Sequence, residues 1–299
     1  MTKPGARNNG LPVNPITDVY AGVLAEIIES KRVPLDAREI IPMITNTDGI
    51  DLTSRMIMWV EYNFTGKTVI TDLRPKTLPT IQADAVPKSA PLKWISVGIE
   101  TTIDEEDDIK AGKVYPVNRT EQAFRVVAEG ENTFLLDGFT KLGAKGFGAL
   151  AAVDGIHVVA AGKTWALSTG EEIVEDIRKM KVAMVTGKKF MAKTLALPQT
   201  LDLLLDRTYT GTGITSTGRT IREVLNDRKY FDNIKSVLGI DSPVGLDDVQ
   251  SNMGFVAAVN VTIGEEYKEG RNKITPIEEK ISPFILFQPE SVVKLTGTV

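Results

Sequence analysis

The pattern of hydrophobic positions is helical near the middle of the chain, over residues 118–137. Apolar residues recur there every three or four positions and would line one side of a helix. Asn118 followed by Glu121 has the arrangement of a capping box, and Gly138 is suited to end the helix. Gly130 lies inside this helix, where glycine costs about 1 kcal/mol relative to alanine. The sequence therefore predicts a long helix with a bend at Gly130.

Further helices are predicted on both sides of this one. Residues 19–30 (VYAGVLAEIIES) contain two apolar series at helical spacing. Ser168 and Thr169 precede Glu171 and Glu172, which is a second capping-box pattern and predicts the start of another helix. Shorter helices are predicted over residues 199–206 and 219–227.

Two segments in the first third of the chain have the composition of strands. Residues 53–64 (TSRMIMWVEYNF) are rich in aromatic and β-branched residues, and residues 92–102 alternate between two faces. Residues 65–90 between them are polar and contain several prolines. We predict that the two strands flank a polar tip in a long projecting hairpin. Such a hairpin buries little within its own subunit, and the surface of a partner would order it.

The rest of the chain predicts a mixed α/β unit over residues 155–280. Residues 193–197 have the pattern of a strand, and the apolar run 255–263 (FVAAVNVTI) is typical of a buried strand. Residues 281–296 predict strand, turn and strand, with the turn at Gln288-Pro289. Residues 1–17 are rich in Pro, Gly and Asn and predict a flexible or extended arm.

Composition limits the classes of function. The 299 residues are 42% hydrophobic and 25% charged, which is ordinary for a globular protein of one large core or two domains. No run approaches the roughly 18 apolar residues of a membrane span, and the N-terminus lacks the hydrophobic core of a signal peptide. The absence of cysteine excludes thiol catalysis and cysteine-ligated metals. A net charge of −4 is unlike the basic excess of a dedicated nucleic-acid binder.

Candidate catalytic features fail on inspection. His157 is the one histidine, lies among branched apolar residues and has no Gly-x-Ser-x-Gly elbow to partner it, so we interpret it as a packed strand residue. The acidic run 104–108 (DEEDD) lacks the spacing of a calcium loop and suits the start of a helix. The glycine-rich run 211–218 (GTGITSTG) is followed by Arg219 instead of the lysine of a phosphate loop, so it predicts a mobile surface loop. No catalytic, cofactor-binding or metal-binding residue is predicted. Packing or interface roles are expected for Trp59, Trp94 and Trp165.

The order of elements over residues 89–150 resembles the tailed-phage major capsid proteins of the Hong Kong 97 type and their relatives, the encapsulins. In those proteins a hairpin strand leads into a short acidic segment that ends in glycine. A long helix called the spine follows, then an apolar pair with a glycine and a second glycine-apolar element. The matching segments here are residues 91–99, 103–112 (IDEEDDIKAG), 120–131 (TEQAFRVVAEGE), 134–138 and 142–150 (LGAKGFGAL).

This resemblance implies an α+β capsid fold in four parts. They are an N-terminal arm (1–52), an extended loop hairpin (53–102), a peripheral domain with the spine helix (103–154 and 281–299) and an axial domain (155–280). It implies a structural protein and not an enzyme, with no cofactor and no membrane association. Copies of the chain would assemble in the host cytoplasm, as pentamers and hexamers, into an icosahedral virion shell around double-stranded DNA, without sequence-specific binding. Scaffolding, portal or decoration proteins would be its other partners.

Other functions stay open at this point. An encapsulin shell around an enzyme cargo is the nearest alternative, although residues 1–47 do not have the typical encapsulin opening and favour a virion protein. A phage tail or neck protein would also lack catalytic residues. A soluble enzyme of another family is disfavoured by the missing catalytic signatures.

Overall fold

The computed structural model describes residues 35–45, 49–65, 82–102, 104–105, 107, 111, 119–139, 141, 143–186, 190–211 and 218–298. Several predictions lie wholly or partly outside these residues: the helix at 19–30 with the arm before it, the cap at Asn118, residues 66–81 of the tip predicted at 65–90, and parts of the acidic and glycine-rich runs. All that follows concerns the described residues.

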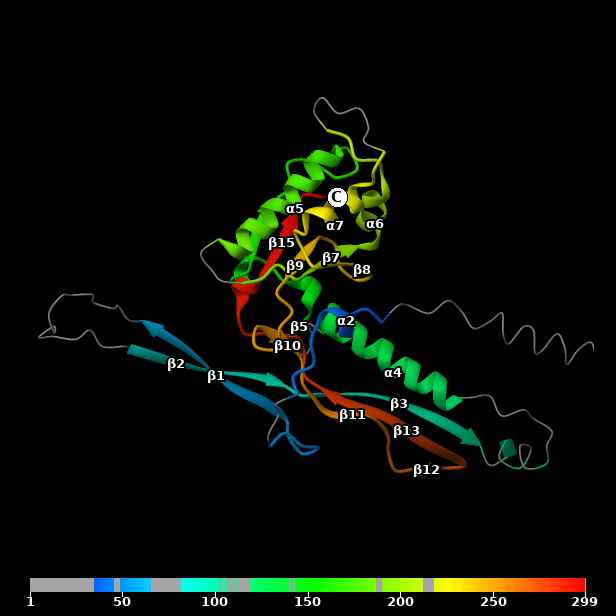
Figure 1. Ribbon diagram of the computed structural model, residues 1–299. Coiled ribbons are helices and arrows are strands. Elements are labelled where there is room, and N and C mark those ends of the chain that lie inside the picture. The colour runs from blue at the N-terminus through cyan, green and yellow to red at the C-terminus, as the bar shows by residue number, and fades with distance from the viewer. Residues whose placement is uncertain are drawn as a thin grey trace, which may run out of the picture. The chain divides into compact units, whose positions relative to one another are not determined.

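One sheet is built on β13 (Asn272–Ile281), which pairs antiparallel with β3 (Lys93–Thr102) along its whole length. The other edge of β13 pairs with β11 (Ala257–Ile263) and β12 (Tyr267–Glu269). Helix α4 (Arg119–Leu136) packs along β3 and β13, as Figure 1 shows. The long predicted helix is therefore confirmed, and it ends as expected, because Gly138 has a positive φ of 77°.

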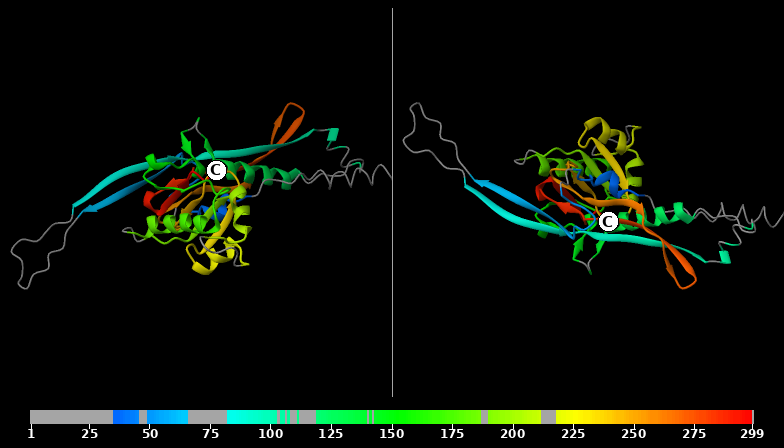
Figure 2. Two further views of the ribbon diagram at one scale, coloured as in Figure 1. Left: turned by 90° about the horizontal axis from the view of Figure 1, so that it is seen from above. Right: turned by 90° about the horizontal axis from the view of Figure 1, so that it is seen from below.

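The hairpin is confirmed as a structure, but one of its predicted strands is wrong. β1 (Met56–Thr65) pairs antiparallel with β2 (Gln82–Pro91), and Figure 2 shows these strands side by side in blue and cyan. Residues 92–102, predicted as the partner of β1, instead form β3 and pair with β13. The sequence concealed β2 because QADAVPKSAP has low β-propensity and contains prolines, which strands tolerate mainly at a sheet edge.

A second sheet has five strands in the order β6-β15-β9-β7-β8. These are β6 (His157–Ala160), β15 (Val292–Thr296), β9 (Val244–Leu246), β7 (Thr194–Pro198) and β8 (Asn233–Val237). Apolar side chains of this sheet share a core with helices α5 (Gly170–Val185), α6 (Gln199–Asp202) and α7 (Ile221–Arg228) and with the 3-10 turn η4 (Leu203–Asp206). The helices predicted after residue 168, over 199–206 and over 219–227 are confirmed here as α5, as α6 with η4, and as α7.

The assignment of strands to the two sheets differs from the prediction. The sequence analysis grouped residues 281–299 with the long helix, yet β15 pairs with β6 and β9 in the five-stranded sheet. It also placed β11 and β12 in the 155–280 unit, whereas both pair with β13 beside α4. Hydrophobic periodicity identifies a strand but carries no information on its partner, and this is why both assignments failed.

The prediction of a buried strand at 255–263 is also wrong for most of its length. Phe255 and Val256 are buried, but from Ala257 onward the strand is partly exposed, and Ile263 is 52% exposed. Among the described strands β11 pairs with β13 alone, so it is an edge strand of its sheet there. An edge strand with this many apolar residues is a surface that natural proteins usually cover.

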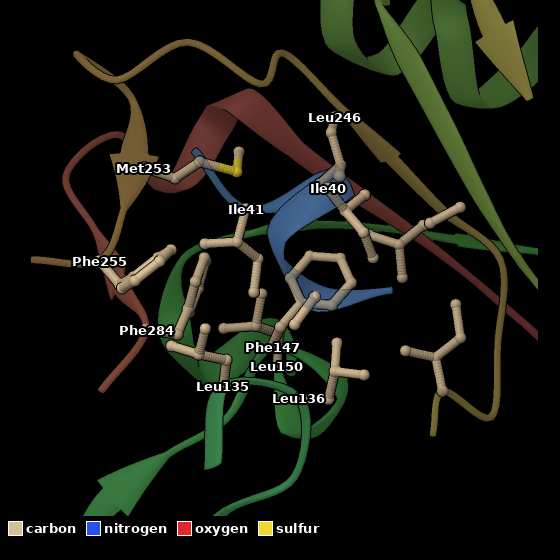
Figure 3. Close-up of a cluster of buried hydrophobic side chains, with 14 of the residues drawn as sticks. Ile40, Ile41, Leu135, Leu136, Phe147, Leu150, Leu246, Met253, Phe255 and Phe284 are labelled. Atoms are coloured by element: carbon tan, nitrogen blue, oxygen red, sulfur yellow. The ribbon is translucent and has the colours of Figure 1, made fainter. Parts of the chain in front are cut away.

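A hydrophobic cluster joins the two sheets. It includes Ile40 and Ile41 at the end of helix α2 (Ala37–Ile40), the end of α4, and the 3-10 turn η2 (Phe147–Ala149). Figure 3 shows these side chains converging from segments far apart in the sequence. The rings of Phe147 and Phe284 meet edge to face with centroids 5.6 Å apart. Short elements complete the fold: β4 (Gly138–Phe139), β5 (Ala144–Lys145), η3 (Ala152–Asp154), β10 (Met253–Gly254), β14 (Ile285–Leu286) and η5 (Pro289–Ser291).

Candidate assembly surfaces

The β1–β2 hairpin presents an apolar face to solvent. Side chains alternate along β1, and Met56, Met58 and Val60 all point to the exposed side, with Met58 70% exposed. The strand partner of Val60 is Pro87, which adds another apolar side chain to the same face. Isolated apolar residues on a surface are normal, but a contiguous row of them is typical of a contact site.

The opposite face of the hairpin is attached to the rest of the chain. The Trp59 ring packs edge to face against Phe287, with centroids 5.5 Å apart, and its Nε1 donates a hydrogen bond to Glu61 at 3.4 Å. Lys88 lies 3.8 Å from Glu61 across the two strands. Trp59 is thus a packing residue, and the contacts that it makes fix which face of the hairpin turns outward.

A groove of about 650 Å³ runs between β3 and α4. Trp94 and Phe139 line it and are both close to half exposed. The Lys280 Nζ lies over the Trp94 ring, 5.1 Å from its centroid, and donates a hydrogen bond to the Leu52 carbonyl at 2.6 Å. The remaining lining residues are Lys93, Ile95, Ser96, Glu129, Gly130, Thr133, Phe134 and Gly138.

Helix α2 is fastened to α4 and β13 by polar contacts that the sequence did not reveal. The Ala37 amide donates to the Asn132 side chain at 2.9 Å. Arg38 donates from Nε to Glu131 at 2.7 Å and from Nη2 to Glu279 at 2.9 Å. Burial, together with the neighbouring Glu131 carboxylate, raises the pKa of Glu279 to about 7, and the opposing effect of Arg38 is smaller. Glu131 is 93 positions and Glu279 is 241 positions from Arg38 along the chain, so no local sequence motif could have indicated this cluster.

The residues considered for chemistry stay apart. His157 lies in a strand, as predicted, and this strand, β6, is at the edge of its sheet and leaves the side chain partly buried. Trp165 is fully buried with its Nε1 3.4 Å from the Asp176 carboxylate. Of the acidic run 104–108, only residues 104, 105 and 107 are described, and residues 212–217 of the glycine-rich run fall outside the described part. Across the described ranges, no group of three or more His, Asp and Glu side chains could hold a metal ion. Within those ranges there is also no helix long and apolar enough to span a membrane.

Comparison with known proteins identifies the class. The sequence matches the model of the major capsid protein family over residues 66–245, more than half of the chain. The chain therefore belongs to the major capsid protein family. Members of this family build the shells of phages, so the protein is a structural shell protein and not an enzyme. A search of curated protein sequences found no match.

Solved structures show the same fold despite low sequence identity. The capsid protein of Myoviridae phage XM1 superposes with a TM-score of 0.67 at 12% identity, covering 89% of this chain and 93% of that one. Mycobacterium phage Adephagia gives 0.59 at 10% identity, with coverage of 91% and 92%. A virus-like particle from Pyrococcus furiosus gives 0.57 at 15% identity, with coverage of 95% and 100%. The predicted α+β fold of the Hong Kong 97 type is confirmed.

Proposed function

We propose that this chain forms an icosahedral virion shell around double-stranded DNA, with its copies arranged in pentamers and hexamers. The observation that carries the proposal is the exposed apolar face of Met56, Met58 and Val60 on the hairpin. Among the described residues, the ring contact between the hairpin and its own subunit is made from the Trp59 side, so a neighbouring copy is the natural cover for the other side. A closed shell repeats such a contact many times, and weak contacts then add up through multivalency.

The groove between β3 and α4 is a second contact surface in this proposal. Exposed Trp94 and Phe139 have the amphipathic aromatic character that interfaces favour. The unpaired edge of β11 would be covered in the same shell.

We assign the four parts of the capsid fold according to strand pairing. The arm would be residues 1–52 and the extended loop β1 and β2 with the residues between them. The peripheral domain would hold α4, β3 and β11 to β13, and the axial domain the five-stranded sheet with α5 to α7. This assignment moves β15 from the peripheral to the axial domain, since β15 is the strand between β6 and β9. It also moves β3 out of the extended loop, and β11 to β13 out of the axial domain, since these four strands pair in one sheet.

The enclosed DNA needs no specific binding site. The net charge of −4 is consistent with a shell that holds nucleic acid without adhering to it. Assembly in the host cytoplasm, with scaffolding, portal or decoration proteins as partners, completes the proposal.

Electron microscopy of particles from producing cells tests this proposal. We expect closed icosahedral shells whose double-stranded DNA resists added nuclease and becomes digestible once the shells are disrupted. A protein that stays monomeric or forms small oligomers in every assembly condition would contradict it.

A shell around an enzyme cargo is the second candidate. It is favoured by the likeness to the Pyrococcus furiosus virus-like particle, whose whole chain is covered. Particles of this kind would contain a second protein and no nuclease-resistant DNA, so the same preparation distinguishes the two functions.

A further inference from the structure

Three side chains from three separate elements meet beside the hydrophobic cluster. Arg38 comes from α2, Glu131 from α4 and Glu279 from β13. The two carboxylates are buried, with side chains 4% and 0% exposed, whereas the Arg38 side chain is 50% exposed. Water therefore reaches the guanidinium side of this cluster but not its carboxylate side.

The charges in this cluster do not balance. Two ionised carboxylates would face one guanidinium, and they lie within hydrogen-bonding reach of each other. The Oε2 atom of Glu279 is buried and has no hydrogen-bond partner among the described residues. A buried carboxylate oxygen without a donor is unfavourable, and a proton shared between two carboxyl groups removes both the like charge and the missing donor.

Within the described part of the chain, Arg38 is the one cation that acts on Glu279. Strand β3 places Ile95 opposite Glu279, and Lys93 stands two positions further along the same strand, opposite Ile281. Strand β11 (AAVNVTI) has no charged residue. On the side of α2, the Arg38 guanidinium stacks over the Phe255 ring at 5.9 Å. Glu131 and Arg38 are the groups that act on Glu279.

We propose that Arg38, Glu131 and Glu279 form a proton-controlled clasp that holds the segment Leu35–Thr45 against helix α4 and strand β13. When Glu279 is protonated, its hydroxyl donates a hydrogen bond to the Glu131 carboxylate, and Arg38 donates hydrogen bonds to both carboxyl groups from the solvent side. When Glu279 loses the proton, two like charges face each other in a buried site, and the clasp loosens.

The segment held by this clasp touches several parts of the fold. Ile40 and Ile41 are buried in the hydrophobic cluster. The Leu238 amide, in the turn after β8, donates to the Asp36 side chain at 2.9 Å, and Lys235 donates to the Glu39 carbonyl at 2.6 Å. Loosening the clasp would therefore weaken contacts with both sheets. In this way the loss of one proton from Glu279 would affect residues far from that side chain.

The direction of the pH effect follows from the raised pKa. Glu279 has a pKa of about 7 in the folded chain against an ordinary 4.5, so between these values the folded chain binds more protons than the unfolded chain. Stability and clasp closure then fall as pH rises through about 7. The window lies near neutrality, where small changes in acidity change the population of the closed clasp.

Amide hydrogen exchange of the full-length chain tests the clasp. We expect the protection of the peptide over residues 35–45, corrected for the intrinsic effect of pH on exchange, to fall several-fold from about pH 6 to about pH 8. Glu279→Gln keeps an acceptor for Arg38 and a donor for Glu131, so it should hold protection constant across that range. Glu278→Gln, a neutralisation at the adjacent position, serves as the matched control and should retain the wild-type dependence.

A second variant keeps the test decisive if Glu279→Gln does not fold. Glu131→Gln removes the like charge, so the midpoint of the protection change should move to lower pH, which a merely structural role would not produce. Protection that is independent of pH in the wild-type chain, or an unmoved midpoint in Glu131→Gln, overturns the proposal. None of these outcomes depends on whether the shell holds DNA or protein.

Discussion

Gly130 of helix α4 lies directly against Ile95 of strand β3, so that a Cβ atom at Gly130 would stand 3.0 Å from Cγ2 of Ile95. The sequence suggested a bend at this glycine, but the helix is assigned without interruption from Arg119 to Leu136. The glycine instead allows the strand to approach the helix closely. Its cost in helix propensity is offset by the packing that it permits.

Gly130→Ala should therefore destabilise the subunit. The added methyl group improves helix propensity by about 1 kcal/mol, but it forces a shift of the partly buried Ile95, and overpacking of this kind costs about 1–3 kcal/mol. We expect a net loss of roughly 1 kcal/mol in the free energy of unfolding, measured by urea denaturation of the unassembled chain.

The background Ile95→Ala separates the two effects. This substitution removes the Cγ2 atom that the new Cβ would meet, so in that background Gly130→Ala should become neutral or stabilising. An equal loss in both backgrounds would show that the glycine is needed for another reason.

Thr169 and Thr220 cap helices α5 and α7 in the same way, each accepting a hydrogen bond from the third residue of its helix. Replacing either with alanine should lower the free energy of unfolding by about 1 kcal/mol. Thr133→Ala is the matched control, because it replaces an exposed threonine inside a helix and breaks no cap. A loss at Thr133 as large as the other two would argue against capping as the cause.

These capped helices are also the part of the fold that the sequence predicts best. Thr169 and Glu172 are three residues apart and both partners of their reciprocal hydrogen bonds lie in one turn, so the signal is local. Strand partners are a different matter. Leu92 separates β2 from β3, yet β2 pairs with β1 and β3 with β13. The pairing is decided by which side chains pack together in three dimensions, and the sequence pattern of a strand does not contain that information.

The assembly surfaces were likewise only partly predictable from the sequence. The sequence indicated a hairpin that needs a partner, but the exposed row of Met56, Met58 and Val60 was found only in the structure. The Arg38 cluster was missed because its three members come from a short helix, a long helix and a strand that only the folded chain brings together.

Arg38→Gln should destabilise the chain in a manner that depends on pH. Loss of the guanidinium leaves two buried carboxylates without a cation, and breaking a buried ion pair costs about 3–5 kcal/mol. Because the Arg38 side chain is half exposed, we expect the loss in the free energy of unfolding to lie at the lower end of this range. Protonation of Glu279 relieves the repulsion, so the loss should be larger at about pH 8 than at about pH 6. Urea denaturation at both pH values measures the difference.

Arg38→Lys is the control for charge. A lysine retains the positive charge but lacks the planar fork that reaches two carboxylates at once, so an intermediate loss is expected. If Arg38→Gln cost the same at both pH values, the proton on Glu279 would have no part in the stability of the site.

Met58→Glu should block shell formation while leaving the subunit folded. Met58 lies at the centre of the exposed hairpin face and is 70% exposed, so a carboxylate there meets water in the free subunit and costs little. In a shell that covers this face, the same carboxylate would be buried against a neighbour without a partner, and such burial is strongly unfavourable. We expect wild-type thermal stability of the unassembled chain and the loss of closed particles, scored by sedimentation and electron microscopy.

Met58→Leu, which keeps the face apolar, should assemble normally. Particles of Met58→Glu formed as efficiently as those of the wild type would show that the face remains open to water in the shell, and the hairpin would then act through its opposite side or its tip.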